Sequence, residues 1–174
     1  RPLVLGKKDN SYFVSSETCA LDLIGAEYIR EIEPGEIIII SKEGIISFTI
    51  PSESVIQPAH CIFEHVYFSR PDSQVFGDSV HLVRKEMGRQ LSIEHPAEAD
   101  IVMSIPDSGN SAALGFAEQS GIPFEIGMTR NHYVGRTFIQ PEQSIRDFSV
   151  KVKLNPIKHV LKGKRVVVVD DSLV

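Results

Sequence analysis

The sequence contains few cysteines, and this scarcity excludes one class of protein. Only Cys19 and Cys61 occur among the 174 residues, which is too few for the disulfide framework of a secreted domain. We therefore expect a reducing compartment. The chain also begins with Arg1-Pro2, without an initiator methionine or a charged-then-apolar leader, so we expect it to be a piece of a longer protein.

Long hydrophobic runs and a surplus of basic residues are also missing. The longest apolar runs, Ile37–Ile40 and Val166–Val169, are far shorter than the roughly 20 residues that span a bilayer. There are 18 Lys and Arg against 23 Asp and Glu, a net charge of −5, so electrostatics gives little support to a nucleic-acid role. No internal repeat or low-complexity segment occurs, and a small, highly charged metabolite fits better as a ligand.

The first part of the chain, up to about Pro58, has the pattern of an antiparallel β-sheet edge. Turns such as Pro34-Gly35 and Glu43-Gly44 separate short β-type runs. The predicted strands are Leu3–Leu5, Tyr12–Val14, Tyr28–Ile32, Glu36–Ile40 and Ile45–Ile50.

One short helix is predicted within this β-rich part, over Thr18–Ile24. Ser15-Ser16-Glu17 offers an N-cap, and Gly25 ends the helix where a left-handed conformation is needed. Cys19 lies on this helix and is interpreted as a small buried residue.

After Cys61 the pattern becomes that of an α/β fold. The spacing of Val80, Val83, Met87 and Leu91 predicts one amphipathic helix. A strand, a helix and a strand follow, over Ile101–Ile105, Asn110–Ser120 and Pro123–Ile126. The apolar run Val166–Val169 predicts a central parallel strand covered by helices on both sides, in a doubly wound sheet.

Two acidic residues and a serine, Asp170-Asp171-Ser172, follow that last strand. Ligands of open α/β sheets bind at the carboxyl ends of the strands, and two adjacent carboxylates there could reach two ribose hydroxyls, directly or through Mg²⁺. A turn or helix cap after a buried strand explains the same residues equally well.

Two further segments carry candidate chemistry. The stretch from Asn131 to Pro141, with Arg130 before it and Arg136 inside it, is polar and could form a lid that brings Arg136 to a pyrophosphate; an ordinary surface loop is the alternative. Ile105–Gly109 runs from a strand into a helix N-terminus, which favours an anion. Asp107 or Ser108 could instead simply cap that helix.

These segments, with Cys61–Ser73, resemble glutamine phosphoribosylpyrophosphate (PRPP) amidotransferases. Val166–Ser172 resembles the PRPP motif of type I phosphoribosyltransferases, and Tyr133–Ile139 resembles the flexible loop specific to the amidotransferases. Cys61–Ser73 resembles the sequence that opens their transferase half. Arg1 to about Ile50 is similar to the end of their glutaminase domain, so the resemblance covers the whole chain.

This resemblance implies a type I phosphoribosyltransferase-like, doubly wound and mostly parallel α/β sheet, preceded by the C-terminal β-rich edge of an Ntn-hydrolase glutaminase domain. The implied domains are residues 1–58 and 59–174, the second ending inside the PRPP loop. The glutaminase nucleophile of the family would lie upstream, so we expect the isolated piece to be inactive.

The implied activity is the first committed step of purine synthesis, in which ammonia from glutamine replaces the pyrophosphate of PRPP to give phosphoribosylamine. The resemblance implies that Arg136 and Tyr133 act in catalysis and that Ser108, Asp170 and Asp171 hold Mg²⁺. The implied PRPP-binding residues are Asp107, Ser108, Arg130, Asp170, Asp171 and Ser172.

Other implications concern metals, partners and location. Cys61 matches a ligand of the [4Fe-4S] cluster found in one branch of the family, although such a cluster needs four ligands and a buried structural cysteine explains Cys61 nearly as well. His132 departs from the arginine of many members and is interpreted as a solvated loop residue. Purine nucleotides are implied inhibitors, a homotetramer the implied assembly, and the cytoplasm, or a plant plastid, the implied location.

Two alternatives remain open at this point. Another type I phosphoribosyltransferase would carry the same Asp170-Asp171-Ser172 motif. A non-catalytic regulator could keep the pocket as a PRPP sensor, although it would need neither an arginine-bearing lid nor part of a glutaminase domain.

Overall fold

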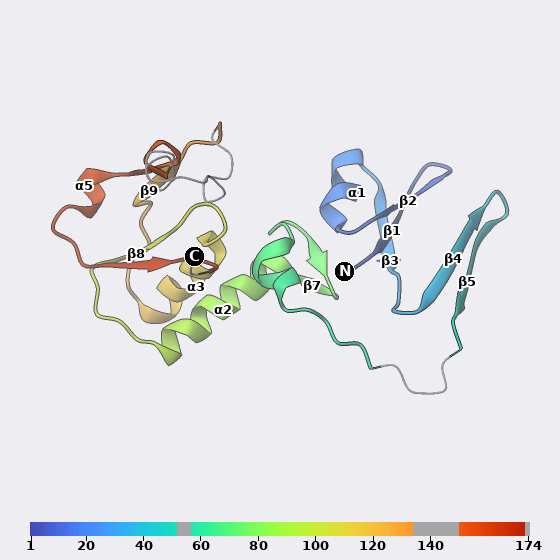
Figure 1. Cartoon of the computed structure of the whole chain (residues 1–174), viewed down its shortest axis with the longest axis horizontal. Helices are drawn as coiled ribbons and strands as arrows, with labels where there is room; N and C mark the ends of the chain where they lie inside the picture. The colour runs from blue at the N-terminus through green and yellow to red at the C-terminus, as the bar shows by residue number, and fades with distance from the viewer. Residues whose placement is uncertain (52–56, 134–149, 173–174) are drawn as a thin grey trace, which may run out of the picture. The chain divides into compact units, whose positions relative to one another are not determined.

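The structure, a computed structural model, describes residues 1–51, 57–133 and 150–172. It is a mixed α/β chain that divides into two compact units, Arg1–His81 and Leu82–Val174, and Figure 1 shows the elements of each. By their contacts, residues 59–81 group with the first unit. The domain boundary near residue 58 stays a prediction.

Antiparallel strands dominate the first unit, as predicted. In one sheet β1 pairs on one edge with β2 and on the other with β3, while β4 and β5 form a separate hairpin. Val4, Leu21 and Ala26 are buried together, with Phe13 packed against them. The strands are β1 (Val4–Lys8), β2 (Ser11–Ser15), β3 (Glu27–Glu31), β4 (Glu36–Ser41) and β5 (Gly44–Thr49).

Helix α1 (Thr18–Ile24) has the predicted bounds, and Gly25 ends it in the left-handed conformation with φ 64°. Cys19 is buried, as predicted. The N-cap residue is Glu17, within the predicted Ser15-Ser16-Glu17, but its side chain makes no capping hydrogen bond. The Glu17 carboxylate instead accepts hydrogen bonds from the Arg70 backbone N–H (2.8 Å) and the Ser73 hydroxyl (3.0 Å).

The rest of the first unit consists of short elements. The π-helical turn η1 (Glu64–Phe68) precedes the two-residue strands β6 (Gln74–Val75) and β7 (Asp78–Ser79). Arg70 and Asp72 form an ion pair at 2.7 Å.

Two closely packed helices, α2 (Val80–Glu94) and α3 (Asn110–Ser120), follow, and both match the sequence prediction. A Cβ atom at Gly88 would overlap the Ala112 carbonyl group, and one at Gly115 would overlap that of Lys85. The backbones can approach this closely because both positions are glycine. Glu118 adds ion pairs to Lys85 (2.5 Å) and Arg89 (2.7 Å).

Strands β8 (Ile101–Ser104) and β11 (Val166–Val169) pair in parallel, with Val166 opposite Ile101. Val102 and Val169 form a buried core with Ala113, Phe116 and Ala117. The parallel strand at Val166–Val169 is confirmed. Its predicted coverage on both faces is wrong for the part of the chain described, because Val168 is 53% exposed.

The region after α3 departs most from the prediction. The expected strand Pro123–Ile126 is reduced to one bridge between Phe124 and Val102, and Ile126 is exposed. An antiparallel pair, β9 (Met128–Arg130) and β10 (Leu154–Pro156), was not predicted, and the short helix α5 (Lys158–Leu161) precedes β11. Among the described residues, every helix is too short or too polar to cross a bilayer.

Candidate functional site

Two loops meet at the carboxyl ends of the parallel strands β8 and β11. The Ile105 N–H donates to the Val169 carbonyl at 2.9 Å. Gly109 is buried, and a Cβ atom there would stand 2.5 Å from the Val169 carbonyl oxygen and 3.3 Å from the Asp170 Cα. The strand pairing and this glycine therefore hold loop 105–109 against residues 170–172.

The acidic pair after β11 is organised by its own short-range hydrogen bonds. The Asp171 N–H donates to Asp170 Oδ1 at 2.9 Å, and the Ser172 hydroxyl donates to Asp171 Oδ1 at 2.7 Å. Asp171 Oδ2 is buried and has no hydrogen-bond partner in the described part of the chain. Since a buried carboxylate oxygen normally has a partner, this atom has an unused capacity to bind a hydroxyl or a cation.

The environment of Asp170 disfavours its charged form. Desolvation raises the pKa of this carboxyl above its ordinary value and repulsion by Asp171 adds to the effect, while the Asp171 N–H opposes it. A cation or a hydroxyl donor next to the pair would offset both the desolvation and the repulsion.

Loop 105–109 contains a cis peptide bond between Pro106 and Asp107 and leads directly into α3. The N-cap of α3 is Gly109, without any side-chain cap. The alternative in which Asp107 or Ser108 caps the helix is therefore wrong. Both residues are exposed, so their polar groups are accessible to a ligand.

Arg130, at the end of β9, forms an ion pair with Asp107, from its Nη1 to Asp107 Oδ2 at 2.8 Å. Pairing of Arg130 with Leu154 of β10 fixes the arginine backbone. The Arg130 Nε is buried and lacks a hydrogen-bond partner among the described residues. One donor of the guanidinium is thus engaged and another is unused.

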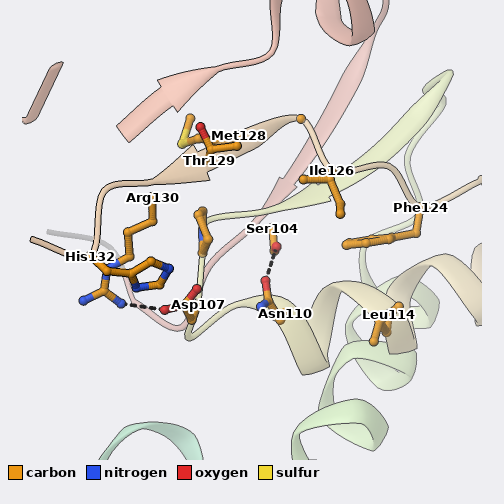
Figure 2. Close-up of a pocket in the computed structure, with 12 residues that line it drawn as sticks. Ser104, Asp107, Asn110, Leu114, Phe124, Ile126, Met128, Thr129, Arg130 and His132 are labelled. Carbon is orange, nitrogen blue, oxygen red and sulfur yellow. Dashed lines mark hydrogen bonds and ion pairs between the residues drawn. The ribbon is translucent and has the colours of Figure 1, made fainter. Parts of the chain in front are cut away.

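These residues border a pocket of about 410 Å³ in the second unit, shown in Figure 2. Leu114, Phe124, Ile126 and Met128 supply apolar walls. The polar part includes the Arg130–Asp107 pair, His132, Thr129, and Ser104, whose hydroxyl lies 2.5 Å from Asn110 Oδ1. The pocket therefore has an apolar wall and a charged one.

The structure brings only some of the predicted site residues together. Asp107 and Arg130 meet in the pocket, whereas Ser108, Asp170 and Asp171 are not among its lining residues. Tyr133 is fully exposed and His132 is an exposed lining residue, consistent with its interpretation as a loop histidine. Arg136, and with it the predicted lid from residue 134 onwards, lies outside the described residues.

Sequence reasoning missed two lining residues, Ser104 and Asn110. Their positions immediately before and after loop 105–109 are a signal that could have identified them, since side chains at a strand end and in the first turn of the next helix face the same loop.

One buried carboxylate oxygen suits Mg²⁺, but the described residues do not assemble a complete ligand set for Mg²⁺ or for an iron–sulfur cluster. Carboxylate oxygens are the ligands that Mg²⁺ prefers, and Asp171 Oδ2 is buried and free to serve. Cys61 is exposed, so its interpretation as a buried structural cysteine is wrong for this chain. The described residues contain no group of three or more His, Cys, Asp or Glu placed to hold a metal, and the two cysteines of the sequence cannot supply four thiolates.

Comparison with known proteins gives a consistent relationship. No protein-family model matches the chain. Amidophosphoribosyltransferase 1, chloroplastic, of Arabidopsis thaliana is 55% identical over the whole chain, which covers 31% of that protein. The amidophosphoribosyltransferase of Mycobacterium tuberculosis is 51% identical, again over the whole chain and 32% of the relative.

Two solved structures match the whole chain as well, each with a TM-score of 0.88 and 51% identity. One is the structure of the allosteric regulatory enzyme of purine biosynthesis, of which the chain covers 37%. The other is glutamine PRPP amidotransferase from B. subtilis complexed with ADP and GMP, of which it covers 38%. The chain thus spans about a third of the length of its relatives, and by sequence and fold it belongs to the amidophosphoribosyltransferase family.

Proposed function

We propose that the protein carrying this chain is a glutamine-dependent amidophosphoribosyltransferase of purine biosynthesis, which converts PRPP, glutamine and water to phosphoribosylamine, glutamate and pyrophosphate. Identities of 51–55% to such enzymes over the whole chain support this activity. The observation that carries it is the buried, unpartnered Asp171 Oδ2, beside Asp170, at the carboxyl end of a parallel strand.

We also propose that the chain contains parts of two domains. Residues 59–174 would form the first part of a type I phosphoribosyltransferase domain with a doubly wound sheet. Residues 1–58 would form the β-rich end of an Ntn-hydrolase glutaminase domain. The parallel pair β8–β11 and the antiparallel sheet β2–β1–β3 are consistent with this division.

Asp170 and Asp171 would bind the ribose hydroxyls of PRPP, with Ser172 orienting Asp171 through its hydrogen bond. The two carboxylates and Ser108 would hold Mg²⁺, which supplies positive charge to the departing pyrophosphate. The contact between Gly109 and Val169 keeps loop 105–109 next to the acidic pair. The arrangement places anion-binding and ribose-binding groups side by side, so that binding also orients C1 of the ribose.

No residue has to act as a strong base, because neutral ammonia is already a nucleophile. Its lone pair forms the new bond to C1, the C1–O bond electrons leave with pyrophosphate, and the resulting ammonium group loses one proton to water. Arg130 and Arg136 would stabilise the leaving group, and Tyr133 would help to exclude water, which would hydrolyse the same carbon.

Partners and location follow the relatives. One solved relative is complexed with ADP and GMP, and another is called an allosteric regulatory enzyme, so we propose purine nucleotides as inhibitors. The homotetramer that the family resemblance implies is kept as a proposal. The Arabidopsis relative is chloroplastic. A plastid location is therefore proposed for a plant protein, and the cytoplasm otherwise.

The test uses the full-length protein and measures pyrophosphate release from PRPP, with ammonia or glutamine as the nitrogen donor. Asp171→Asn should lower kcat/KM by about 100-fold or more, because it removes charge that acts on the reacting group. Asp72→Asn, which changes an exposed carboxylate paired with Arg70, serves as the matched control and should remain active. Calorimetric binding of PRPP by wild-type protein without any pyrophosphate release would reject the enzyme in favour of a sensor.

A further inference from the structure

The Arg130–Asp107 pair joins two elements that are fixed independently of each other. Arg130 belongs to β9, whose backbone is held by β10, and the next residue donates its N–H to the Lys153 carbonyl at 2.7 Å. Asp107 belongs to the loop that Gly109 and Ile105 attach to β11. Because both backbones are held, the 2.8 Å contact follows from the positions of the two elements.

Asp107 is an unusual residue for a site that must accept pyrophosphate. A carboxylate repels a polyanion, and it engages the one guanidinium that lines the pocket within the described residues. Pyrophosphate oxygens can use the Nη1 hydrogen that points at Asp107 only if Asp107 releases it. The unpartnered Nε of Arg130 shows that the guanidinium has capacity for a further acceptor beyond Asp107.

We propose that Asp107 is a positioning residue that competes with pyrophosphate for Arg130 and thereby weakens product binding, rather than a ligand of PRPP. This inference rests on the proposed function, since it assigns a role within the same site. Weaker product binding would raise the turnover rate, because pyrophosphate bound too tightly after C1–O cleavage would be released slowly and limit that rate. The pair also keeps Arg130 oriented, so the arginine need not be ordered when the pyrophosphate group arrives.

The alternatives predict effects of opposite sign. If Asp107 were a ligand of PRPP or of its cation, its neutralisation would weaken binding of PRPP and pyrophosphate. If the pair were only a structural tie between β9 and loop 105–109, neutralisation would lower the melting temperature and leave pyrophosphate affinity unchanged. Competition for Arg130 predicts tighter pyrophosphate binding, with a larger effect when Arg130 is present than when it is absent.

The experiment is a double-mutant cycle in the full-length protein with Asp107→Asn, Arg130→Met and the double variant. The readouts are the inhibition constant of inorganic pyrophosphate against PRPP, the KM for PRPP, and the melting temperature. Asp107→Asn should tighten pyrophosphate inhibition about two- to fivefold, the range expected for loss of a partly exposed ion pair. In the Arg130→Met background the same change should have a clearly smaller effect, because only the direct repulsion between Asp107 and pyrophosphate remains.

The control is Glu98→Gln, which removes a carboxylate that is 96% exposed and lies 3.7 Å from Arg165, and it should leave pyrophosphate inhibition unchanged. Weaker or unchanged inhibition in Asp107→Asn, or an equal shift in both backgrounds, would overturn the proposal. If Asp107→Asn does not fold, Asp107→Ser tests the same sign. Wild-type protein that forms no phosphoribosylamine would reject the proposed function itself, an outcome distinct from all of these.

Discussion

Gly109 lies against the backbone of Val169, and a Cβ atom at Gly109 would stand 2.5 Å from the Val169 carbonyl oxygen. Its φ of −73° is ordinary, so alanine would fail here through collision and not through backbone strain. The glycine is therefore what allows loop 105–109 to touch the strand that carries Asp170 and Asp171.

Gly109→Ala should separate these two loops. We expect a loss of about 1–3 kcal/mol in the free energy of unfolding, as for other overpacked positions, together with a higher KM for PRPP. Urea unfolding and initial rates of the full-length protein measure the two effects. Gly163→Ala is the control: Gly163 has a φ of 75° and open space around it, so alanine should cost stability, about 1–2 kcal/mol, without changing the KM. An unaltered KM in Gly109→Ala would contradict this account.

Gly88→Ala should disrupt the packing of α2 on α3. The added methyl group would overlap the Ala112 backbone, and the helices would have to move apart, at a cost of roughly 1–3 kcal/mol, even though alanine is the better helix former. Gln119→Ala changes an exposed position of α3 and should be close to neutral. Urea unfolding of both variants decides, and a Gly88→Ala protein as stable as wild type would show that the helices can adjust.

Glu36 makes the stability of the first unit depend on acid pH. Hydrogen bonds from Arg30, and then from the Ser47 hydroxyl and the Glu33 N–H, lower its pKa from 4.5 to about 2. Because the unfolded chain binds the proton more tightly, the stabilisation is complete above pH 4.5 and is lost as the pH falls towards 2.

The measurement for Glu36 is the difference in urea midpoint between wild type and Glu36→Gln as a function of pH. This difference should be largest above pH 4.5 and shrink towards pH 2. Glu27→Gln, at an exposed position of β3, should show no such dependence. A difference that stays constant between these pH values would rule out the linkage.

Glu17→Gln should weaken the tie between α1 and residues 70–73. The carboxylate accepts from the Arg70 N–H and the Ser73 hydroxyl, and hydrogen bonds to a charged group contribute about 1.5–3 kcal/mol each in net terms. Because glutamine keeps one acceptor oxygen, we expect a loss of roughly 1–2 kcal/mol. Asp22→Asn, on the exposed face of α1, is the matched control, and equal unfolding midpoints for the two variants would disprove this role.

The sequence predicted the elements that have strong local signals. Helix α1 was bounded correctly because Gly25 adopts the left-handed conformation that ends it, and α3 was bounded correctly by the turn before Asn110 and by Gly121. The predicted strand over Pro123–Ile126 is wrong. The segment has the apolar pattern of a strand, but only Phe124 pairs with another strand. The pairing of a strand depends on distant partners, which local patterns do not contain.

Only the part of the site that follows from local sequence patterns could be predicted. Asp170 and Asp171 follow a strand that is obvious from its valines, so their place at the sheet edge could be inferred. The contact of Arg130 with Asp107 could not, because it depends on β9 and β10, two three-residue strands with no clear pattern. The capping hydrogen bond expected before α1 is missing because the Glu17 side chain has tertiary partners instead.

The exposed part of strand β11 affects the solubility of this chain. Within the described ranges β11 pairs with β8 alone, and Val168 is 53% exposed in a run of four valines. A strand with high β-propensity, no charge and an open edge is a template for pairing with other chains. Preparations of the 174-residue chain alone are therefore expected to form intermolecular β-sheet and to precipitate as their concentration rises, and a lysine at position 168 is the substitution that should keep them in solution.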